Sequence, residues 1–286
     1  GLTRREFLAL SGATIGAATL GHAAEPRGAL EPRAGDRTDS MSRVGVQLYT
    51  VRRQMQDSVE RTLEAVARIG YKEVEFAGFF RRSPAEVRAL LDANGLSAPS
   101  SHSADLDAIR TRFPQVLDEA VTVGHRYVVC AFLGQPERSI DGYKRAAAAF
   151  NQAGEQAARV GITVGYHNHD FEFQPLGDTI GYDILLAECD PKLVTMQMDL
   201  FWLKKAGRDP LAYFAKYPGR FSSVHVKDMD AAGAMVDVGA GQMPFQAYFA
   251  QSKQAGIRHY FVEHDNPADP MASITASYAH LSKMTW

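Results

Sequence analysis

Short runs of strand type alternate with runs of helical spacing along most of the chain, and this alternation limits the possible folds more than any other feature. The strand-type runs are short and rich in β-branched and aromatic residues, and the helical runs often follow Pro or end at Gly. Strands are expected at 44–49, 73–77, 96–101, 127–131, 161–167, 194–198, 221–224 and 259–262. Helices are expected at 58–69, 84–94, 106–123, 139–160, 182–188, 210–216, 245–255 and 270–282.

Eight strand–helix pairs in sequence predict an α/β fold, a single-domain (β/α)8 TIM barrel over residues 43–286. The length of this part of the chain is that of one such barrel. A doubly wound open sheet is the alternative, but no Gly-rich phosphate-binding loop follows the first strand.

The last four expected strands each end in a side chain that can bind a metal ion: His167, Asp199, His225 and Glu263. Because the carboxyl ends of barrel strands meet at one rim, these four side chains predict a metal site there. The fifth strand opens into Tyr-His-Asn-His-Asp-Phe-Glu-Phe at 166–173, which adds His169 and Glu172. Alternate residues of a strand share a face, so His169 competes with His167 for the place of the ligand.

The first three strands also end in polar groups at the same rim, and these predict the part of the pocket that binds substrate. The expected substrate-binding residues are Gln47, Tyr49, Glu75 and His102. Trp202 is expected either to form an apolar platform for a sugar ring or to lie in the core.

The start of the chain is expected to direct export and not to form part of the fold. Residues 1–24 contain Arg4 and Arg5, an apolar stretch and small residues typical of a cleavage site, and they resemble a twin-arginine signal peptide. The apolar stretch is short, which is typical of a processed signal and not of a membrane span. Residues 25–42 are polar and read as a linker, and the predicted location is the periplasm.

Charge and cysteine content restrict the partners. The formal net charge is −2 and no basic block follows the signal, so neither nucleic acid nor an anionic membrane is expected as a partner. Cys130 and Cys189 are the two cysteines. They are expected to be buried free thiols, with a disulfide as the alternative in an oxidising compartment.

From about Arg43 onward the chain resembles the xylose isomerase-like TIM barrel superfamily, the sugar phosphate isomerase/epimerase and family 2 apurinic endonuclease type. The motifs that carry the resemblance are Met-Asp-Leu-Phe-Trp at 198–202, His-Val-Lys-Asp at 225–228 and Val-Glu-His at 262–264. The stretch at 166–173 resembles an often exported bacterial subgroup whose relatives are thought to act on 3-keto sugars and glycosides.

The resemblance implies a divalent metal held by Glu, Asp, His and Glu from strands five to eight. Asp199, His225 and Glu263 match the last three of these ligands, while the glutamate of the fifth strand is absent and His167 stands nearest its place. The mixed imidazole and carboxylate set suits manganese, zinc, iron or cobalt. The residues expected to act in catalysis are Glu263, His169, Glu172 and Lys227.

A metal-dependent lyase or isomerase that acts on a keto sugar through an enediolate is therefore the expected function. With imidazole in place of the carboxylate on the fifth strand, the side chains predict elimination rather than symmetric 3-epimerisation. A metal-dependent hydrolase and a non-catalytic sugar-binding barrel are the alternatives from other classes. The expected partners are a sugar substrate and, for supply of a keto sugar, an exported NAD(P)-dependent oxidoreductase.

Overall fold

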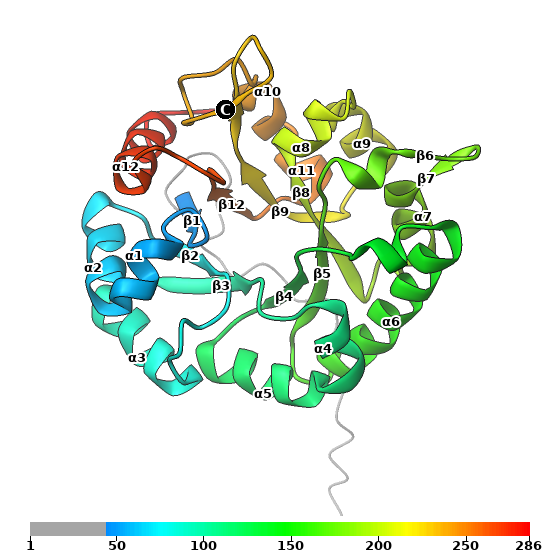
Figure 1. Cartoon of the computed structure of the whole chain (residues 1–286), viewed down its shortest axis with the longest axis horizontal. Helices are drawn as coiled ribbons and strands as arrows, with labels where there is room; N and C mark the ends of the chain where they lie inside the picture. The colour runs from blue at the N-terminus through cyan, green and yellow to red at the C-terminus, as the bar shows by residue number, and fades with distance from the viewer. Residues whose placement is uncertain (1–43) are drawn as a thin grey trace, which may run out of the picture. The chain divides into compact units, whose positions relative to one another are not determined.

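The computed structural model describes residues 44–286, which form a closed barrel of eight parallel strands surrounded by helices (Figure 1). The order of the strands around the barrel is β1-β12-β9-β8-β5-β4-β3-β2, so the predicted (β/α)8 fold is confirmed. The expected signal peptide at 1–24 and linker at 25–42 lie outside the described residues. The barrel strands are β1 (Val44–Gln47), β2 (Glu73–Phe76), β3 (Ser97–Ser101), β4 (Tyr127–Cys130), β5 (Thr163–His167), β8 (Val194–Asp199), β9 (Phe221–Val226) and β12 (His259–Val262).

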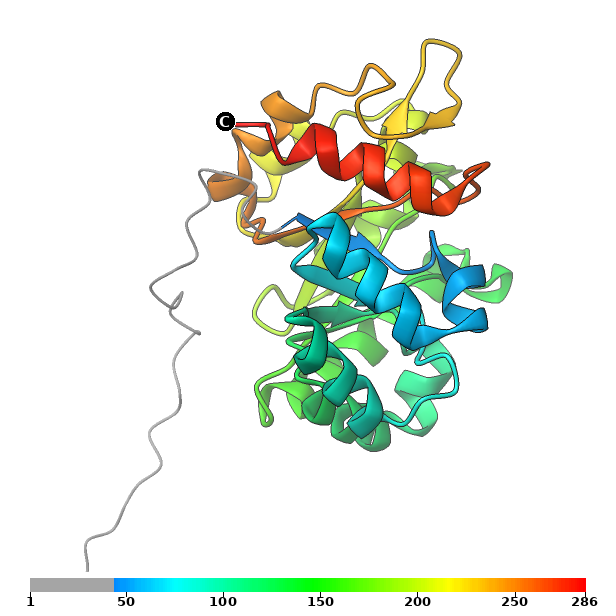
Figure 2. The same ribbon diagram turned by 90° about the vertical axis from the view of Figure 1, so that its left-hand side faces the viewer.

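The α-helices lie outside the strands, and two short hairpins extend from the loops (Figures 1 and 2). The helices are α1 (Arg52–Asp57), α2 (Val59–Ile69), α3 (Pro84–Asn94), α4 (Leu106–Thr111), α5 (Phe113–Val123), α6 (Ile140–Ala158), α7 (Gly181–Glu188), α8 (Leu200–Lys205), α9 (Pro210–Lys216), α10 (Phe245–Phe249), α11 (Ser252–Ala255) and α12 (Pro270–Leu281). The hairpins pair β6 (Pro175–Leu176) with β7 (Thr179–Ile180) and β10 (Asp228–Met229) with β11 (Met235–Val236). Among the described residues no helix is long and apolar enough to cross a membrane.

Helix α3 shows how local sequence sets the ends of an element. The Ser83 side chain accepts a hydrogen bond from the Glu86 backbone, and the Glu86 side chain accepts one from the Ser83 backbone. Pro84 occupies the first turn, and Gly95 ends the helix at a φ of 62°. The structure has this helix with the expected bounds.

Two expected helices are each divided in the structure. The run at 106–123 forms α4 and α5, because Arg112 leaves the helical conformation and Pro114 has no N–H to donate to the preceding turn. The run at 245–255 forms α10 and α11, with Gln251 outside both helices. Helix α8 was not expected at all, since its six residues are too few to show a helical period.

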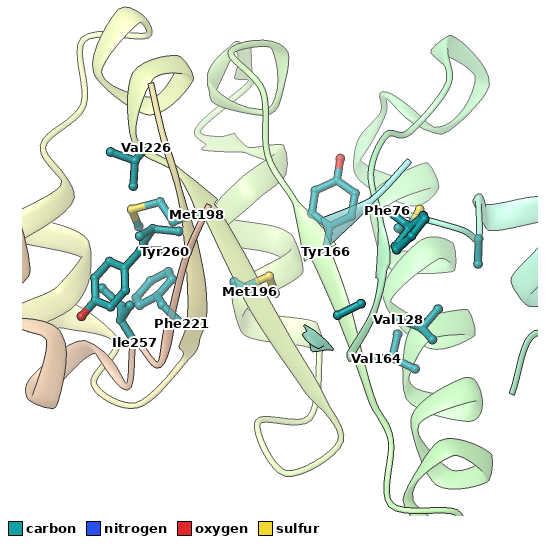
Figure 3. Close-up of a cluster of buried hydrophobic side chains, with 14 of the residues drawn as sticks. Phe76, Val128, Val164, Tyr166, Met196, Met198, Phe221, Val226, Ile257 and Tyr260 are labelled. Carbon is teal, nitrogen blue, oxygen red and sulfur yellow. The ribbon is translucent and has the colours of Figure 1, made fainter. Parts of the chain in front are cut away.

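The strands alternate between apolar residues that pack against the helices and small or polar residues that face the barrel interior. On β5, the ring of Tyr166 contacts Phe150 of α6, with ring centroids 5.7 Å apart. Figure 3 shows part of this outer layer, including Val164 and Tyr166 on β5 and Met196 and Met198 on β8. The next residues along the strands therefore point inward.

Within the barrel interior, small residues lie next to the ring of Phe261. Gly45 and Phe261 are paired neighbours on β1 and β12, and a Cβ added to Gly45 would lie 2.6 Å from a ring carbon of Phe261. Gly165 on β5 leaves similar room beside Val129 and Thr195. Above this ring the interior is polar.

Cys130 and Cys189 are buried free thiols.

Candidate active site

A cavity of about 430 Å³ opens at the carboxyl ends of the barrel strands. It is lined by Tyr49, Ala77, His102, Ala131, Phe132, His167, His169, Lys227, Glu263, Asp265 and Asn266. A second cavity of about 430 Å³ adjoins it, with His102, Ala131 and Phe132 lining both. Phe132, which lines both cavities, is half exposed.

Asp199, His225 and Glu263 lie close enough together to hold a metal ion, with one ligand atom of each within 4.8 Å of the others. All three are buried. His225 Nδ1 lies 2.6 Å from Glu263 Oε2, and His225 Nε2 lies 2.6 Å from Glu75 Oε2. Burial alone would lower the pKa of His225, but the carboxylates of Glu263 and Glu75 raise it to about 10.

Two hydrogen bonds fix the position of Asp199 at the end of β8. Its backbone N–H donates to Asn168 Oδ1 at 3.0 Å, which ties β8 to the loop after β5. Its Oδ1 accepts the N–H of Trp202 at 2.9 Å and so caps helix α8. Its Oδ2 is buried and makes no hydrogen bond. Burial raises the pKa of this carboxyl to about 6.

His167 lies beside this group, at the end of β5. Its Nε2 is 3.6 Å from Asp199 Oδ2, and its Nδ1 is 3.0 Å from Gln197 Oε1. His102, His167 and His225 form a second group that could hold a metal ion. Because His225 belongs to both groups, it cannot give the same nitrogen to two ions. Burial, followed by repulsion from His225, holds the pKa of His167 well below its usual range.

Lys227 is a cation held among acidic side chains at the edge of the cavity. Its Nζ lies 3.0 Å from Asp199 Oδ2, 2.8 Å from Glu263 Oε2 and 2.7 Å from Asp265 Oδ1. Burial lowers the pKa of Lys227, but these three carboxylates raise it above its usual range, so the side chain stays charged. Burial likewise raises the pKa of Glu263, but Lys227 and His225 hold it well below its usual range.

His169 lines the cavity, and its ring nitrogen Nδ1 is buried and makes no hydrogen bond. Burial, and then Lys227, lowers the pKa of His169 to about 3, so its imidazole is uncharged at neutral pH. The ring is stacked on Phe171 and lies beside Trp202, with centroids 6.0 Å apart. Trp202 itself is not among the residues that line the cavity.

Glu172 lies beneath His169 and not in the cavity. It is fully buried and accepts hydrogen bonds from Tyr166 Oη at 2.6 Å and from the His169 backbone N–H at 2.8 Å. Burial raises its pKa to about 7. The structure thus places Glu172, expected as a catalytic group, where it supports the chain segment that carries His169.

The residues expected to bind substrate divide into two sets. Tyr49 and His102 line the cavity, and the Tyr49 ring is packed under the guanidinium of Arg52. Gln47 and Glu75 are fully buried and bonded to each other at 2.7 Å. They lie below the cavity among other polar side chains, out of reach of a ligand in it.

The donor set of the site fits a divalent cation. Two carboxylates and two imidazoles converge, and the buried Asp199 Oδ2 faces the Lys227 ammonium at 3.0 Å and His167 Nε2 at 3.6 Å. The ammonium of Lys227 already provides one positive charge between Asp199 and Glu263. The four ligands expected from the sequence, His167, Asp199, His225 and Glu263, would hold the ion.

Several residues of the site were not identified from the sequence, among them Gln197, Asn168, Asp265 and Phe132. Gln197 precedes Asp199 by two positions on the same face of β8, a period-two signal that could have found it. Asn168 shows no such signal, because its role depends on the contact between two strands. Asp265 and Phe132 lie just past strand ends, as the expected residues do, but in loops without a sequence period.

Comparison with known proteins agrees with this geometry. The sequence profile of a family described as xylose isomerase-like TIM barrel matches residues 63–284. An inosose dehydratase from Lacticaseibacillus casei is 26% identical over 193 residues, which cover 59% of this chain and 63% of that protein. The chain thus matches less than two thirds of the length of this curated relative.

Two solved structures show the likeness in fold. A sugar phosphate isomerase/epimerase from Parabacteroides distasonis superposes with a TM-score of 0.76 at 22% identity, covering 90% of this chain and 98% of the other. A 3-keto-D-glucoside 4-epimerase from E. coli superposes with a TM-score of 0.63 at 18% identity, covering 79% of this chain and 94% of the other.

Proposed function

Because the chain belongs to the xylose isomerase-like TIM barrel family, we propose that it is an enzyme that modifies a keto sugar, and specifically a divalent-metal-dependent lyase that eliminates a substituent from a 3-keto glycoside or an inosose. The names of similar proteins support a sugar substrate: one is an inosose dehydratase and another a 3-keto-D-glucoside 4-epimerase. The side chains of this site favour elimination over epimerisation.

The observation that carries the proposal is the unequal pair of groups at the cavity. Glu263, at the end of β12, and His169, after β5, both line it, and β9 and β8 lie between these two strands in the barrel. An epimerase that moves a proton across one carbon needs two comparable bases on opposite faces of that carbon. A carboxylate and an uncharged imidazole are not a comparable pair, whereas in elimination a single group can take the proton from carbon and return it to the leaving oxygen.

His169 is the group placed to take the proton from the carbon next to the carbonyl. Its ring is uncharged, so one of its two nitrogens carries a lone pair that can accept this proton, and Nδ1 has no hydrogen-bond partner within the protein. The C–H electron pair then forms a carbon–carbon double bond, and the bond from the next carbon to its oxygen substituent breaks. The imidazolium returns the proton to the leaving oxygen, so the step balances without an outside acid.

Lys227 is placed to stabilise the negative charge on the sugar oxygen that develops during proton removal. Its ammonium is charged and buried at the cavity edge, where the low dielectric strengthens its effect. A divalent cation held by His167, Asp199, His225 and Glu263 would act as a Lewis acid on the same oxygens when bound. Tyr49 and His102 remain available to hydrogen-bond the sugar.

The proposal is tested by incubating the purified protein with a 3-keto glycoside and, separately, with free ketohexoses in deuterated water. Release of the aglycone, lost on addition of a chelator, is expected. Epimerisation of a free ketose with deuterium at C3 and without elimination would refute the lyase assignment. Binding of the sugar without any turnover would favour the non-catalytic barrel, and hydrolysis without a double-bond product would favour the hydrolase.

The periplasmic location and the supplying enzyme also remain proposals. A 3-keto substrate requires an oxidation step at C3, which an exported NAD(P)-dependent sugar oxidoreductase would perform. The twin-arginine pattern in residues 1–24 supports export. Fractionation of the producing cell tests the location, and recovery of the protein in the cytoplasm would contradict it.

A further inference from the structure

Beneath the cavity lies a layer of buried polar side chains that cross the barrel interior. Glu75 on β2 contacts Gln197 on β8 and His225 on β9, and these strands are not neighbours of β2 in the barrel. The bonds between them therefore span the inside of the barrel. All three side chains are fully buried. Among buried polar groups such a network is stable only when its donors and acceptors match.

Glu75 uses its full acceptor capacity inside the protein. Its Oε2 accepts from Gln47 Nε2 at 2.7 Å and from His225 Nε2 at 2.6 Å. Its Oε1 accepts from Gln197 Nε2 at 2.7 Å and from the hydroxyl of Ser100. A carboxylate offers about four acceptor positions, so Glu75 has none left for a substrate or a metal ion.

The orientation of the Gln197 amide follows from its neighbours. Its Nε2 must face Glu75, because a carboxylate accepts hydrogen bonds and cannot donate them. The second proton of the same NH₂ group goes to Ser223 Oγ at 3.1 Å. The amide oxygen is therefore the atom that faces His102 and His167.

Gln197 Oε1 lies 2.6 Å from His102 Nε2 and 3.0 Å from His167 Nδ1. An amide oxygen only accepts, so each of these nitrogens must carry a proton. In a neutral imidazole the other nitrogen then holds a lone pair. This nitrogen is Nδ1 in His102, and in His167 it is Nε2, which lies 3.6 Å from Asp199 Oδ2.

We propose that Glu75 and Gln197 are positioning residues that fix which N–H of the His102, His167 and His225 rings is directed into the buried layer, and so which ring nitrogen is turned away from it. Glu75 holds His225 through Nε2–H, which leaves Nδ1 on the side of Glu263. Gln197 holds His167 through Nδ1–H, which leaves Nε2 on the side of Asp199. Glu75 thus fixes the donating nitrogen of His225 directly. Through Gln197 it also fixes which nitrogen of His167 and of His102 carries the proton.

The consequence for cation binding rests on the proposed metal site, whereas the proton positions on the rings do not. Metal-binding imidazoles commonly donate their other N–H to a carboxylate or carbonyl, and loss of that partner lowers metal affinity about 10- to 100-fold. The tautomers can be read in the metal-free protein. The two measurements therefore separate failure of this inference from failure of the proposed function.

The first experiment compares Glu75→Gln with Glu73→Gln. Both carboxylates are buried on β2 and both contact a histidine, since Glu73 Oε2 lies 2.8 Å from His259 Nδ1. Glu73 precedes Glu75 by two residues and lies toward the other end of the barrel. Calorimetric titration with Mn²⁺ is expected to show about 10- to 100-fold weaker binding for Glu75→Gln and wild-type binding for Glu73→Gln. Equal affinities for the two variants would overturn the role of Glu75.

The second experiment reads the rings directly, by long-range ¹H–¹⁵N NMR of the metal-free protein. The wild type is expected to show His167 protonated at Nδ1 and His102 protonated at Nε2. Gln197→Met, which keeps the length of the side chain, should give mixed tautomers at both rings. Unchanged tautomers in a Gln197→Met protein with native circular dichroism would overturn the inference. A wild type that binds no divalent cation but shows these tautomers would refute the proposed metal site and support the positioning role.

Discussion

Lys227 offers the sharpest test of the charge arrangement in the site. Its ammonium lies within 3.0 Å of carboxylate oxygens of Asp199, Glu263 and Asp265, and its side chain is 2% exposed. Lys227→Met keeps the apolar stem but removes the charge that these carboxylates surround. The same carboxylates would bind a divalent cation, so metal should compensate for the missing ammonium.

The expected effect follows from the burial of the ion pairs. Removing one partner of a buried ion pair costs about 3–5 kcal/mol, because the other charge is left uncompensated. In the presence of a chelator, the free energy of unfolding of Lys227→Met should fall by about this amount. A cation present at 100 times its Kd restores about 2.7 kcal/mol, so Mn²⁺ should return most of the loss.

The assay is urea unfolding followed by circular dichroism, with EDTA and then with Mn²⁺. Lys216→Met is the matched control, because the Lys216 side chain is 59% exposed and lies 3.5 Å from Asp183. That exposed pair should contribute less than about 1 kcal/mol and should not respond to metal. If Lys227→Met is as stable as the wild type in EDTA, or if Mn²⁺ shifts all three proteins equally, the reasoning is refuted.

Three further predictions concern other parts of the site and barrel. His167→Ala should lose bound metal on elemental analysis while His169→Ala keeps the metal and loses turnover, and the opposite pattern would exchange the two assignments. The pKa of Glu172 is raised from 4.5 to about 7 by burial. The protonated side chain therefore contributes its full amount to the free energy of unfolding below about pH 4.5, and this contribution is lost as the pH rises through about 7. Between pH 5 and pH 8 the wild type should lose up to about 3 kcal/mol of unfolding free energy relative to Glu172→Gln, and a constant difference would contradict the burial argument. Gly45→Ala should destabilise the barrel by about 1–3 kcal/mol, because its Cβ would lie 2.6 Å from a Phe261 ring carbon, and an unchanged urea midpoint would show that the ring moves aside easily.

The sequence predicted the barrel because each element carries its own signal. On β8, the order Val-Thr-Met-Gln-Met-Asp alternates apolar and polar residues and ends in a metal-capable side chain. Pro and Gly mark the ends of α3 in the same local way. The division of the run at 106–123 was missed because Pro114 is compatible with the first turn of a helix as well as with a break.

The division of the expected site residues into a cavity lining and a buried layer could not be predicted from the sequence. Gln47 and Glu75 have the period-two spacing of inward-facing residues, and the strand pattern does not tell how deep in the barrel each one lies. The contact between Glu75 and His225 forms only when the sheet closes, since β2 and β9 are distant along the chain. Such depth and closure are properties of the whole barrel.

Closure of the barrel also sets the time at which the site can exist during synthesis. β12, which precedes Glu263, pairs with β1 through Val44, Gly45 and Val46. β1 therefore gains this neighbour only after β12 has been synthesised. Contacts between such distant segments form late, because the entropy of closing the long loop must be overcome first. While β12 is still inside the ribosome, Glu263 is not in place and the barrel between β9 and β1 is still open. Uptake of a cation by the proposed ligand set would therefore follow the emergence of β12 from the ribosome.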